Sequence, residues 1–436
     1  MLIQGWGGYP RIDADMVAPA TRSATVESLS KLSGKTVIAR GMGRSYGDSA
    51  LAPCVLGTEY QNLLLDFDGV SGTIRCGAGT VMADLLEILV PKGWFMPVTP
   101  GTKFISIGGA IASDVHGKNH HVDGCFSDHV VSLDLMLASG EVVTCSKSEN
   151  ADLYHATCGG MGLTGIILEA TFRLKAIQSP FVEQTTLKAA TLQDALSLFD
   201  THHRATYSVA WIDCLATGSG LGRSLIMLGE HADCARPAPP PKKFSVSIPF
   251  QMPAQLLNRF TVKTFNALYY HRLQTGERHK LVHFEPYFYP LDGIGNWNRL
   301  YGKPGFIQYQ FVLPRSAGSD GMSTVLKRIS SSRRGSFLAV LKVFGSQNAN
   351  LLSFPMAGYT LAVDFKMDDG LFEFLNELDA IVLDFGGRIY LAKDARMSEK
   401  TFKQSYPGWE ALQEVRARYG AQRKFASLQS RRLGLD

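Results

Sequence analysis

Residues Lys35–Asp48, KTVIARGMGRSYGD, decide how the rest of the chain is interpreted. The apolar first half is typical of a buried strand, and the second half places three glycines within seven residues. Successive backbone N–H groups in such a loop can form a nest that binds an anion, and Arg44 and Ser45 would add a positive charge and a hydroxyl. A tight turn without a ligand is the alternative interpretation.

A second glycine-rich stretch runs from Thr99 to Asp123 and is expected to be one long loop. Small residues from Ser106 to Ser113 (SIGGAIAS) would let a large, flat ligand lie close to the backbone. The stretch continues into DVHGKNHH, which contains three histidines. His116 and His120 would be spaced as metal ligands only on a helix, and the intervening glycine and asparagine disfavour a helix. We therefore expect no metal site here.

The third glycine-rich loop, Gly160–Gly165 (GMGLTG), matches the GxGxxG pattern of dinucleotide-binding proteins. That pattern binds a pyrophosphate where a strand precedes it and a helix follows it. Here Asp152–Ala156 is predicted to be helical and Ile166–Phe172 to be a strand, which is the reverse order. The match is therefore interpreted as coincidental, and no Rossmann domain is expected.

Composition places the chain among ordinary globular proteins. Its 436 residues include 43 glycines, 45% hydrophobic and 19% charged residues, with a net charge of +5. That charge is too small to suggest a nucleic-acid-binding protein. The seven cysteines form no CxxC pair, which fits free thiols in a reducing compartment. Because we see no signal peptide and no apolar run of membrane-spanning length, we expect a cytoplasmic protein.

The order of the predicted elements indicates an α+β protein of three parts, residues 1–178, 179–385 and 386–436. The first part is predicted to contain strands at Asn62–Phe67 and Gly72–Cys76, a helix capped by Thr80, and a hairpin within residues 130–145. The second is predicted to contain strands at Phe306–Pro314, Phe337–Gly345 and Tyr359–Phe365 and a helix at Leu371–Leu383. The third continues as Arg-rich helical sequence, which is either a solvated face or a contact for an anionic surface.

Together the three glycine-rich segments resemble the FAD-binding segments of the vanillyl-alcohol-oxidase superfamily. Outside them, HGKNHH, FIQYQFVLP, LKVFG and YLAKDAR resemble its decaprenylphosphoryl-β-D-ribose 2′-oxidase subfamily, and the resemblance extends over nearly the whole chain from GWGGYPR onward. It implies a two-subdomain FAD-binding fold of the vanillyl-alcohol-oxidase (PCMH) type plus an α+β substrate or cap domain with an antiparallel sheet. Residues 386–436 would return to the FAD-binding domain.

The resemblance implies that FAD is the cofactor. Many relatives attach FAD covalently through a histidine in the first loop, and Arg44 occupies that position here, so we predict that FAD is bound noncovalently. The implied FAD-binding residues are Ala39, Arg40, Gly41, Met42, Gly43, Arg44, Ser45, Tyr46, Gly47, Asp48, Ser49, Gly101, Ser106, Ile107, Gly108, Gly109, Ser113, Asp114, Val115, His116, Gly162, Ile167 and Tyr390.

To oxidise an alcohol, such a site needs an acceptor for the hydroxyl proton and a cation that stabilises the charge developing on the flavin. Lys393 is the candidate for the cation, on a strand and with Asp394 able to pair with it; a structural ion pair is the alternative. His116 is expected near the flavin and the sugar, or only as a support for its loop. Lys118 is a candidate proton acceptor or phosphate contact. Tyr46 would hydrogen-bond the ring system or only cap its loop.

Three strands would carry the substrate side of the site. Side chains alternate along a strand, so Gln308 and Gln310 share one face and Tyr309 points the other way. Lys342 lies in an apolar strand, where a lysine is costly unless it is paired or functional. Lys342 and Gln310 are therefore candidates for binding the ribose hydroxyls or the phosphate. Ala362 stands where mycobacterial relatives have a cysteine that faces the flavin, so we expect that turnover requires no thiol.

The proline-rich segment Pro237–Pro241 is expected to form a surface loop or lid. Together with the apolar and basic stretch Phe244–Leu273 it would contact acyl or prenyl chains in a peripheral, reversible association. An ordinary surface loop followed by a helix is the alternative. The basic residues that would contact anionic lipid are Lys242, Lys243, Arg259 and Lys263.

The sequence therefore predicts FAD-dependent oxidation of the 2′-hydroxyl of a polyprenyl-phosphoryl-β-D-ribose to the 2′-keto sugar, the first half of epimerisation to an arabinose donor. A short-chain NAD(P)H-dependent reductase would complete the epimerisation, and a quinone or dioxygen would reoxidise the flavin. One alternative is a soluble sugar, alditol or aldonolactone oxidase, which is disfavoured because the His-Trp-x-Lys motif common in those enzymes is replaced by Tyr390-Leu-Ala-Lys393. A flavin-binding protein without turnover is the second alternative.

Overall fold

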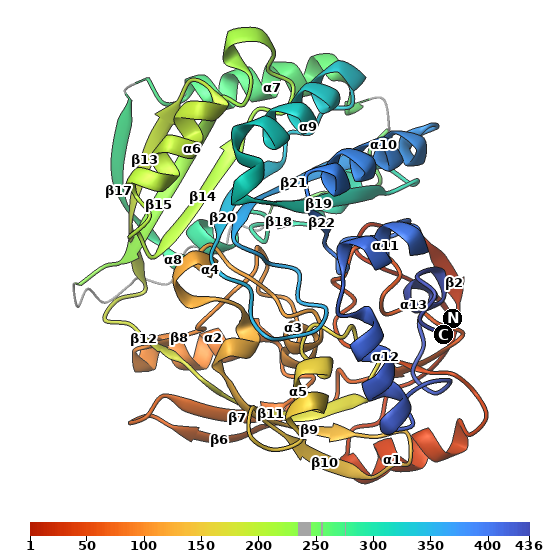
Figure 1. The fold of residues 1–436 in the computed structure, drawn as a ribbon. Coiled ribbons are helices and arrows are strands. Elements are labelled where there is room, and N and C mark those ends of the chain that lie inside the picture. Colours follow the sequence, from red (N-terminus) through yellow and green to blue (C-terminus); the bar gives the residue numbers. More distant parts are fainter. Residues whose placement is uncertain (234–245, 254–255, 275) are drawn as a thin grey trace.

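The computed structural model describes residues 1–233, 246–253, 256–274 and 276–436. In Figure 1 the lower part of the molecule is built from both ends of the chain, and the upper part from its middle. The two termini lie next to each other (Figure 1). Within the described ranges, no helix is long and apolar enough to cross a membrane. The predicted lid Pro237–Pro241, with Lys242 and Lys243, lies outside the described residues.

The lower part contains two main sheets. A three-stranded parallel sheet has the order β3-β5-β4, and a five-stranded antiparallel sheet has the order β10-β9-β11-β7-β6. The helix that precedes the Gly160–Gly165 loop and the strand that follows it confirm that no Rossmann unit is present there. The elements of this part are β1 (Leu2–Gln4), β2 (Arg11–Asp13), β3 (Asp15–Val17), α1 (Arg22–Lys31), β4 (Ile38–Arg40), β5 (Cys54–Gly57), β6 (Leu64–Asp68), β7 (Thr73–Gly77), α2 (Met82–Leu89), β8 (Trp94–Phe95), α3 (Ile107–Ala112), α4 (His120–Asp123), β9 (Val130–Met136), β10 (Val142–Cys145), α5 (Ala151–Thr157), β11 (Ile166–Arg173) and β12 (Lys175–Ala176).

The upper part is dominated by an eight-stranded antiparallel sheet of order β17-β13-β15-β14-β20-β21-β19-β22. Helices α6, α9 and α10 pack on one face of this sheet (Figure 1). The opposite face is therefore left to meet the lower part. The elements are β13 (Phe181–Ala189), α6 (Leu192–Thr201), β14 (Tyr207–Ile212), β15 (Ser224–His231), β16 (Val246–Ser247), α7 (Arg259–His271), β17 (Glu277–His283), α8 (Phe284–Phe288), β18 (Ile294–Gly295), β19 (Phe306–Pro314), α9 (Gly318–Ser332), β20 (Ala339–Phe344), β21 (Gly358–Lys366), α10 (Leu371–Asp384) and β22 (Arg388–Ile389).

The predicted long loop from Thr99 to Asp123 is wrong in one respect, because it contains the short helices α3 and α4. Ser106 begins α3 by accepting a hydrogen bond from the Gly109 amide (3.3 Å), and Ile107 and Ile111 are fully buried. Capping and burial outweigh the low helix propensity of the two glycines. The predicted cap at Thr80 is also displaced, since Val81 precedes α2 and makes no side-chain cap.

After β22 the chain returns to the lower part and forms α11 (Glu399–Ser405), α12 (Trp409–Arg418) and α13 (Leu428–Arg432). Two of its arginines hold this segment in place rather than facing solvent or a surface. Arg416 is fully buried and donates to the carbonyls of Leu163 and Phe425. Arg432 binds the carboxylates of Asp48 and Asp394.

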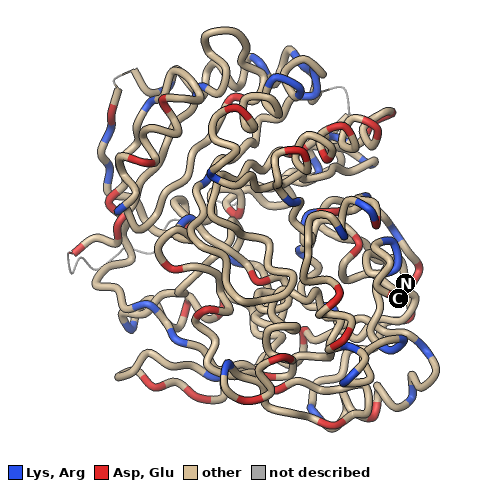
Figure 2. Tube along the Cα trace, viewed as in Figure 1, with Lys and Arg blue, Asp and Glu red and all other residues tan. Residues whose placement is uncertain are grey.

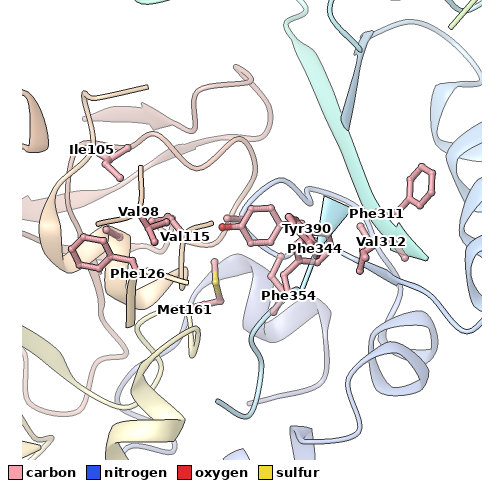
Figure 3. Packing of buried hydrophobic residues seen from close by; sticks show 14 of the residues in the cluster. Val98, Ile105, Val115, Phe126, Met161, Phe311, Val312, Phe344, Phe354 and Tyr390 are labelled. Carbon is pink, nitrogen blue, oxygen red and sulfur yellow. The ribbon is translucent and has the colours of Figure 1, made fainter. Parts of the chain in front are cut away.

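Buried aromatic residues join the two parts. Figure 3 shows Tyr390 between Val115 of the lower part and Phe344 and Phe354 of the upper part. The Tyr390 ring stacks on Phe354 with a centroid separation of 4.6 Å, and its hydroxyl donates to the Ser113 carbonyl (3.0 Å). At these contacts the two parts therefore meet through apolar side chains.

Charged residues of both signs are interspersed along the described chain (Figure 2), which agrees with the small net charge.

Candidate functional site

A cavity of about 680 Å³ lies between the glycine-rich loops and the uncovered face of the large sheet. Gln308 and Gln310 reach it from β19, whereas Tyr309 points to the other face and donates to Asp379 on α10. The predicted site residues that line the cavity are Ala39, Gly41, Met42, Gly43, Arg44, Ser45, Tyr46, Ser49, Gly101, Ser106, Gly108, Gly109, Ser113, Val115, His116, Lys118, Gly162, Ile167, Gln308, Gln310, Lys342, Ala362, Tyr390 and Lys393.

Five of the residues predicted to bind FAD do not line the cavity. Ile107 is fully buried in α3, and Arg40 donates to the carbonyls of Gln4 and Ala50. Asp48 binds Arg432. These three therefore support the loops from behind.

The other two, Gly47 and Asp114, fix the loops against later parts of the chain. A Cβ atom on Gly47 would lie 1.8 Å from the Asp394 carbonyl oxygen, so only glycine allows that approach. The buried Asp114 carboxylate accepts hydrogen bonds from Asn348 (2.8 Å) and Ser353 (2.6 Å).

The first two glycine-rich loops form one wall of the cavity. A side chain on Gly41 would collide with Ser106, whose Oγ would lie 2.1 Å from the added Cβ, so the two loops pack backbone against side chain. Gly43 adopts φ +62°, a left-handed conformation that favours glycine. Arg44 stacks on the Trp6 ring at 4.2 Å. Such a wall of exposed backbone with one cation suits an anionic, flat ligand.

His116 lies where this wall meets the large sheet. Gln310 Nε2 donates to His116 Nε2 at 3.0 Å, and the ring packs on Phe344 and Tyr390. Burial, followed by the neighbouring Lys342, holds the pKa of His116 well below its usual value, so the ring is neutral at pH 7. Its Nδ1 is buried without a hydrogen-bond partner among the described residues, which leaves this nitrogen available to a ligand.

Three of the lysines that line the cavity have depressed pKa values. Burial lowers the pKa of Lys118 and Lys393 to about 7 and that of Lys342 to about 8. Lys118 donates to the Tyr287 carbonyl, and Lys393 Nζ lies 3.8 Å above the centre of the Tyr46 ring. Lys342 has no hydrogen bond or ion pair to any residue that the structure describes.

The charge of the cavity wall is strongly unbalanced. Its described lining includes seven lysines and arginines but a single carboxylate, Asp292. Burial without a carboxylate partner favours the neutral form of a lysine, and an anion that binds next to the lysine favours the charged form again. The cavity is therefore built for a ligand with at least one negative group.

The prediction that Lys393 lies on a strand and pairs with Asp394 is wrong. Lys393 lies in a turn after β22, and Asp394 instead binds Arg432 and accepts backbone hydrogen bonds from Arg396 and Met397. The carboxylate that acts on Lys393 is Asp364 on β21.

Asp364 was missed by sequence reasoning. Its carboxylate accepts from Gln308 Nε2 (2.6 Å) and from the Tyr301 hydroxyl (3.2 Å). Strand alternation from Ala362 would have placed it on the cavity side of the sheet, but the apolar strand gave no sign that a carboxylate would be used there.

Comparison with known proteins places these features in a family. Residues 15–146 match the model of an FAD binding domain. The chain is 36% identical over 449 residues to decaprenylphosphoryl-β-D-ribose oxidase of Mycolicibacterium smegmatis, covering 99% of this chain and 97% of that protein. The chain belongs to the decaprenylphosphoryl-β-D-ribose oxidase family.

Two further proteins are similar to the chain. The chain is 30% identical over 368 residues to an uncharacterised protein of Streptomyces coelicolor, covering 80% of this chain and 99% of that protein. Its fold is similar to that of the Physcomitrella patens protein BBE-like 1, with a TM-score of 0.68, 16% identity, and coverage of 94% of this chain and 89% of that one. These comparisons confirm the predicted fold class, the family and FAD as the cofactor. They also confirm the prediction of an FAD-dependent oxidoreductase that acts on CH–OH groups.

The residues that are present fit FAD. The exposed backbone of the two loops and the surplus of cations provide what a flat, doubly charged dinucleotide requires. No cluster of metal-ligating side chains occurs among the described residues. His120 instead accepts from the Gly345 amide (3.1 Å), and His121 contacts the Ala205 carbonyl (2.8 Å).

Proposed function

We propose that this protein oxidises the 2′-hydroxyl of a polyprenyl-phosphoryl-β-D-ribose to the 2′-keto sugar, with noncovalently bound FAD. The observation that carries the proposal is the convergence of His116, Gln310, Lys342 and Lys393 on one cavity with the glycine-rich loops. The M. smegmatis relative, which is a decaprenylphosphoryl-β-D-ribose oxidase, supports the choice of substrate.

FAD supplies the hydride acceptor for the carbinol carbon. The glycine-rich loops would hold it, with Arg44 in place of a residue for covalent attachment. Lys393, whose Nζ lies over the Tyr46 ring, would supply the positive charge that stabilises negative charge on the bound flavin.

On the substrate side, Gln310 and His116 orient the ribose. His116 is neutral and its Nε2 accepts from Gln310, so its Nδ1 carries the hydrogen and can donate to a sugar oxygen. Lys342 binds the phosphate, which replaces the water that burial removes from its ammonium group. Lys118, with a pKa of about 7, is partly neutral at pH 7 and accepts the hydroxyl proton.

Anaerobic bleaching of the FAD absorbance tests this proposal. Polyprenyl-phosphoryl-ribose should bleach the flavin, whereas free pentoses and aldonolactones at the same concentration should not. Bleaching by aldonolactones alone would favour the sugar or aldonolactone oxidase, and bleaching by neither would favour a flavin-binding protein without turnover.

The proposal includes contact with a membrane surface, because the substrate carries a lipid chain. Helix α7 exposes large apolar side chains, with Phe260 80% and Leu268 70% exposed, next to the exposed basic residues Arg259 and Lys263. The helix ends near Arg272, which lines the cavity. A helix with such a face lies in the interfacial region of an anionic bilayer and would bring the cavity close to the lipid.

Sedimentation with vesicles tests this contact. The protein should bind vesicles that contain phosphatidylglycerol more than pure phosphatidylcholine vesicles, and the double variant F260S/L268S should lose most of that binding. Val70, 94% exposed on a turn of the lower part, provides the matched control V70S, which should bind as the unchanged protein does. Equal binding by F260S/L268S would exclude α7 as the contact.

Two partners complete the proposed reaction. A short-chain NAD(P)H-dependent reductase would convert the keto sugar to the arabinose product, and a quinone or dioxygen would reoxidise the flavin. Consumption of NAD(P)H by such a reductase, dependent on this protein and on the lipid-linked ribose, tests the first. The reoxidation rate with each acceptor after anaerobic reduction tests the second. We also propose the division into residues 1–178, 179–385 and 386–436, which limited proteolysis can test.

A further inference from the structure

Asp364 is a buried carboxylate to which the proposed reaction gives no role. Its side chain is fully buried, and both of its hydrogen-bond donors, Gln308 and Tyr301, are neutral. Some other buried carboxylates are paired with arginine, as Asp213 is with Arg223 and Asp379 with Arg396, whereas Asp114 is held only by neutral donors. Within the described ranges, Asp364 has no such ion pair. A buried negative charge without a bonded cation is costly, so its presence beside the cavity needs an explanation.

The hydrogen bonds of Gln308 connect Asp364 to the cavity wall. The same Nε2 that donates to Asp364 also lies 3.3 Å from the Tyr46 hydroxyl. The Tyr46 ring in turn supports Lys393 Nζ at 3.8 Å from its centre. Asp364 is thus connected through Gln308 to the hydroxyl end of the ring on which the lysine rests; it forms no ion pair with Lys393 but acts on it electrostatically.

The charged groups around Lys393 have opposite effects on its pKa. Burial lowers the pKa of Lys393 to about 7, Asp364 acts to raise it, and Lys342 acts to lower it further. Burial raises the pKa of Asp364 to about 7, which Gln308 and Lys393 counteract. The other groups facing the cluster are His116, which is neutral, and Arg44 and Asp292, which act on Tyr46.

We propose that Asp364 is a positioning residue: its carboxylate, fixed by Gln308 and Tyr301, is the counter-charge that keeps the Lys393 ammonium protonated in the FAD site. Asp364 touches neither the substrate nor the cofactor. The inference deepens the proposed function, since it names what maintains the cation at Lys393. It depends on the FAD site and not on which sugar is oxidised.

The absorbance of oxidised, bound FAD, recorded against pH without substrate, provides a test that requires no turnover. Two coupled groups titrate in two steps that belong to the pair, so the pair should contribute two transitions in the unchanged protein. In Asp364→Asn only the lysine of the pair titrates, and its transition should lie roughly one pH unit or more below the upper transition of the unchanged protein, because a nearby opposite charge is lost. In Lys393→Met only the carboxylate of the pair titrates, and its transition should lie above the lower one by a similar amount, since the coupling is reciprocal. The double variant should show neither transition of the pair, so any transition that remains belongs to Lys118 or Lys342.

Two further variants keep the test decisive. Tyr301→Phe removes one donor to the carboxylate and retains the acid, so the pKa of Asp364 should rise: the lower transition should move up and the upper transition should not move down. Asp379→Asn removes a buried carboxylate that bonds Tyr309 on the opposite face of β19, and it should leave both transitions in place even if the protein is less stable. Transitions in Asp364→Asn that coincide with those of the unchanged protein would overturn the proposal. If polyprenyl-phosphoryl-ribose does not bleach the flavin, the proposed substrate is wrong, but these titrations are unaffected. Failure of the proposed function can therefore be distinguished from failure of the proposed role of Asp364.

Discussion

Gln310 Nε2 lies 3.0 Å from His116 Nε2, and this hydrogen bond joins strand β19 of the large sheet to the second glycine-rich loop. The same amide lies 3.3 Å from Thr360 Oγ1 on the neighbouring strand. The contact therefore fixes both the ring orientation and the tautomer of His116.

Replacing Gln310 by leucine should raise KM for the lipid-linked ribose and lower kcat/KM by about tenfold, the effect of one lost buried hydrogen bond. Steady-state kinetics with that substrate provide the measurement. Tyr309→Phe is the control, since its hydroxyl faces α10, and it should leave KM unchanged. An unchanged KM in Gln310→Leu would remove Gln310 from substrate binding.

FAD should be released completely when the protein is denatured in acid. Arg44 replaces the histidine used for covalent attachment in many relatives, and the lining that the structure describes contains no cysteine and only one histidine, His116. After trichloroacetic acid precipitation, all flavin absorbance should remain in the supernatant. A yellow pellet, or a flavin-sized mass increase of the intact chain, would contradict the prediction.

Lys393→Ala should keep FAD and lose most of its reduction by substrate. The glycine-rich loops supply most of the cofactor contacts, whereas loss of one charge-stabilising group typically costs about a hundredfold or more in rate. Anaerobic stopped-flow reduction measures the rate, and the ratio of flavin to protein absorbance measures retention. Lys188→Ala is a matched control, because Lys188 lies 4.5 Å over the Tyr270 ring outside the cavity lining. Normal bleaching in Lys393→Ala would remove this residue from the mechanism.

The rate constant for flavin reduction should depend on pH as a bell with its maximum near neutrality. Lys118 must be neutral to accept a proton, so the rate rises as pH increases through its pKa of about 7. Lys393 must be charged, so the rate falls as pH increases through its own pKa, also about 7 before substrate binds. A rate that rises without limit from about pH 6 to about pH 9 would exclude a charged lysine from the reacting state.

Ala362 should make the protein resistant to covalent modification by thiol-trapping nitroaromatic inhibitors. Ala362 lines the cavity, and the six described cysteines are buried outside the lining, so no described thiol can be reached from the cavity. Intact mass spectrometry after turnover with such a compound should show no adduct. Ala362→Cys should acquire one, and an adduct on the unchanged protein would show that another nucleophile is within reach.

The regular strands were predicted well because their sequence pattern is local. Phe306–Pro314 was predicted with the bounds that β19 has, and alternation placed Gln308 and Gln310 on the cavity face. The reversed order around Gly160–Gly165 was enough to exclude a Rossmann unit. Each of these conclusions depends only on neighbours in sequence.

The errors concern residues whose partners are distant in sequence. α3 forms despite two glycines because Ile107 and Ile111 are buried by other elements. Asp394 follows Lys393 directly, yet it binds Arg432, 38 residues further on. The carboxylate that does act on Lys393 is Asp364 on another strand, and nothing near position 364 in the sequence indicates this pairing.

The contact between Gly47 and Asp394 has a consequence for how the protein is made. Tyr46 also donates its amide hydrogen to the Ala392 carbonyl (3.0 Å), and Arg432 ties Asp48 to Asp394. Residues 46–48 of the cofactor wall are thus braced by residues 392, 394 and 432, which are synthesised much later. A nascent chain lacks that brace until residue 432 has left the ribosome, so stable capture of the flavin requires that these later residues are present.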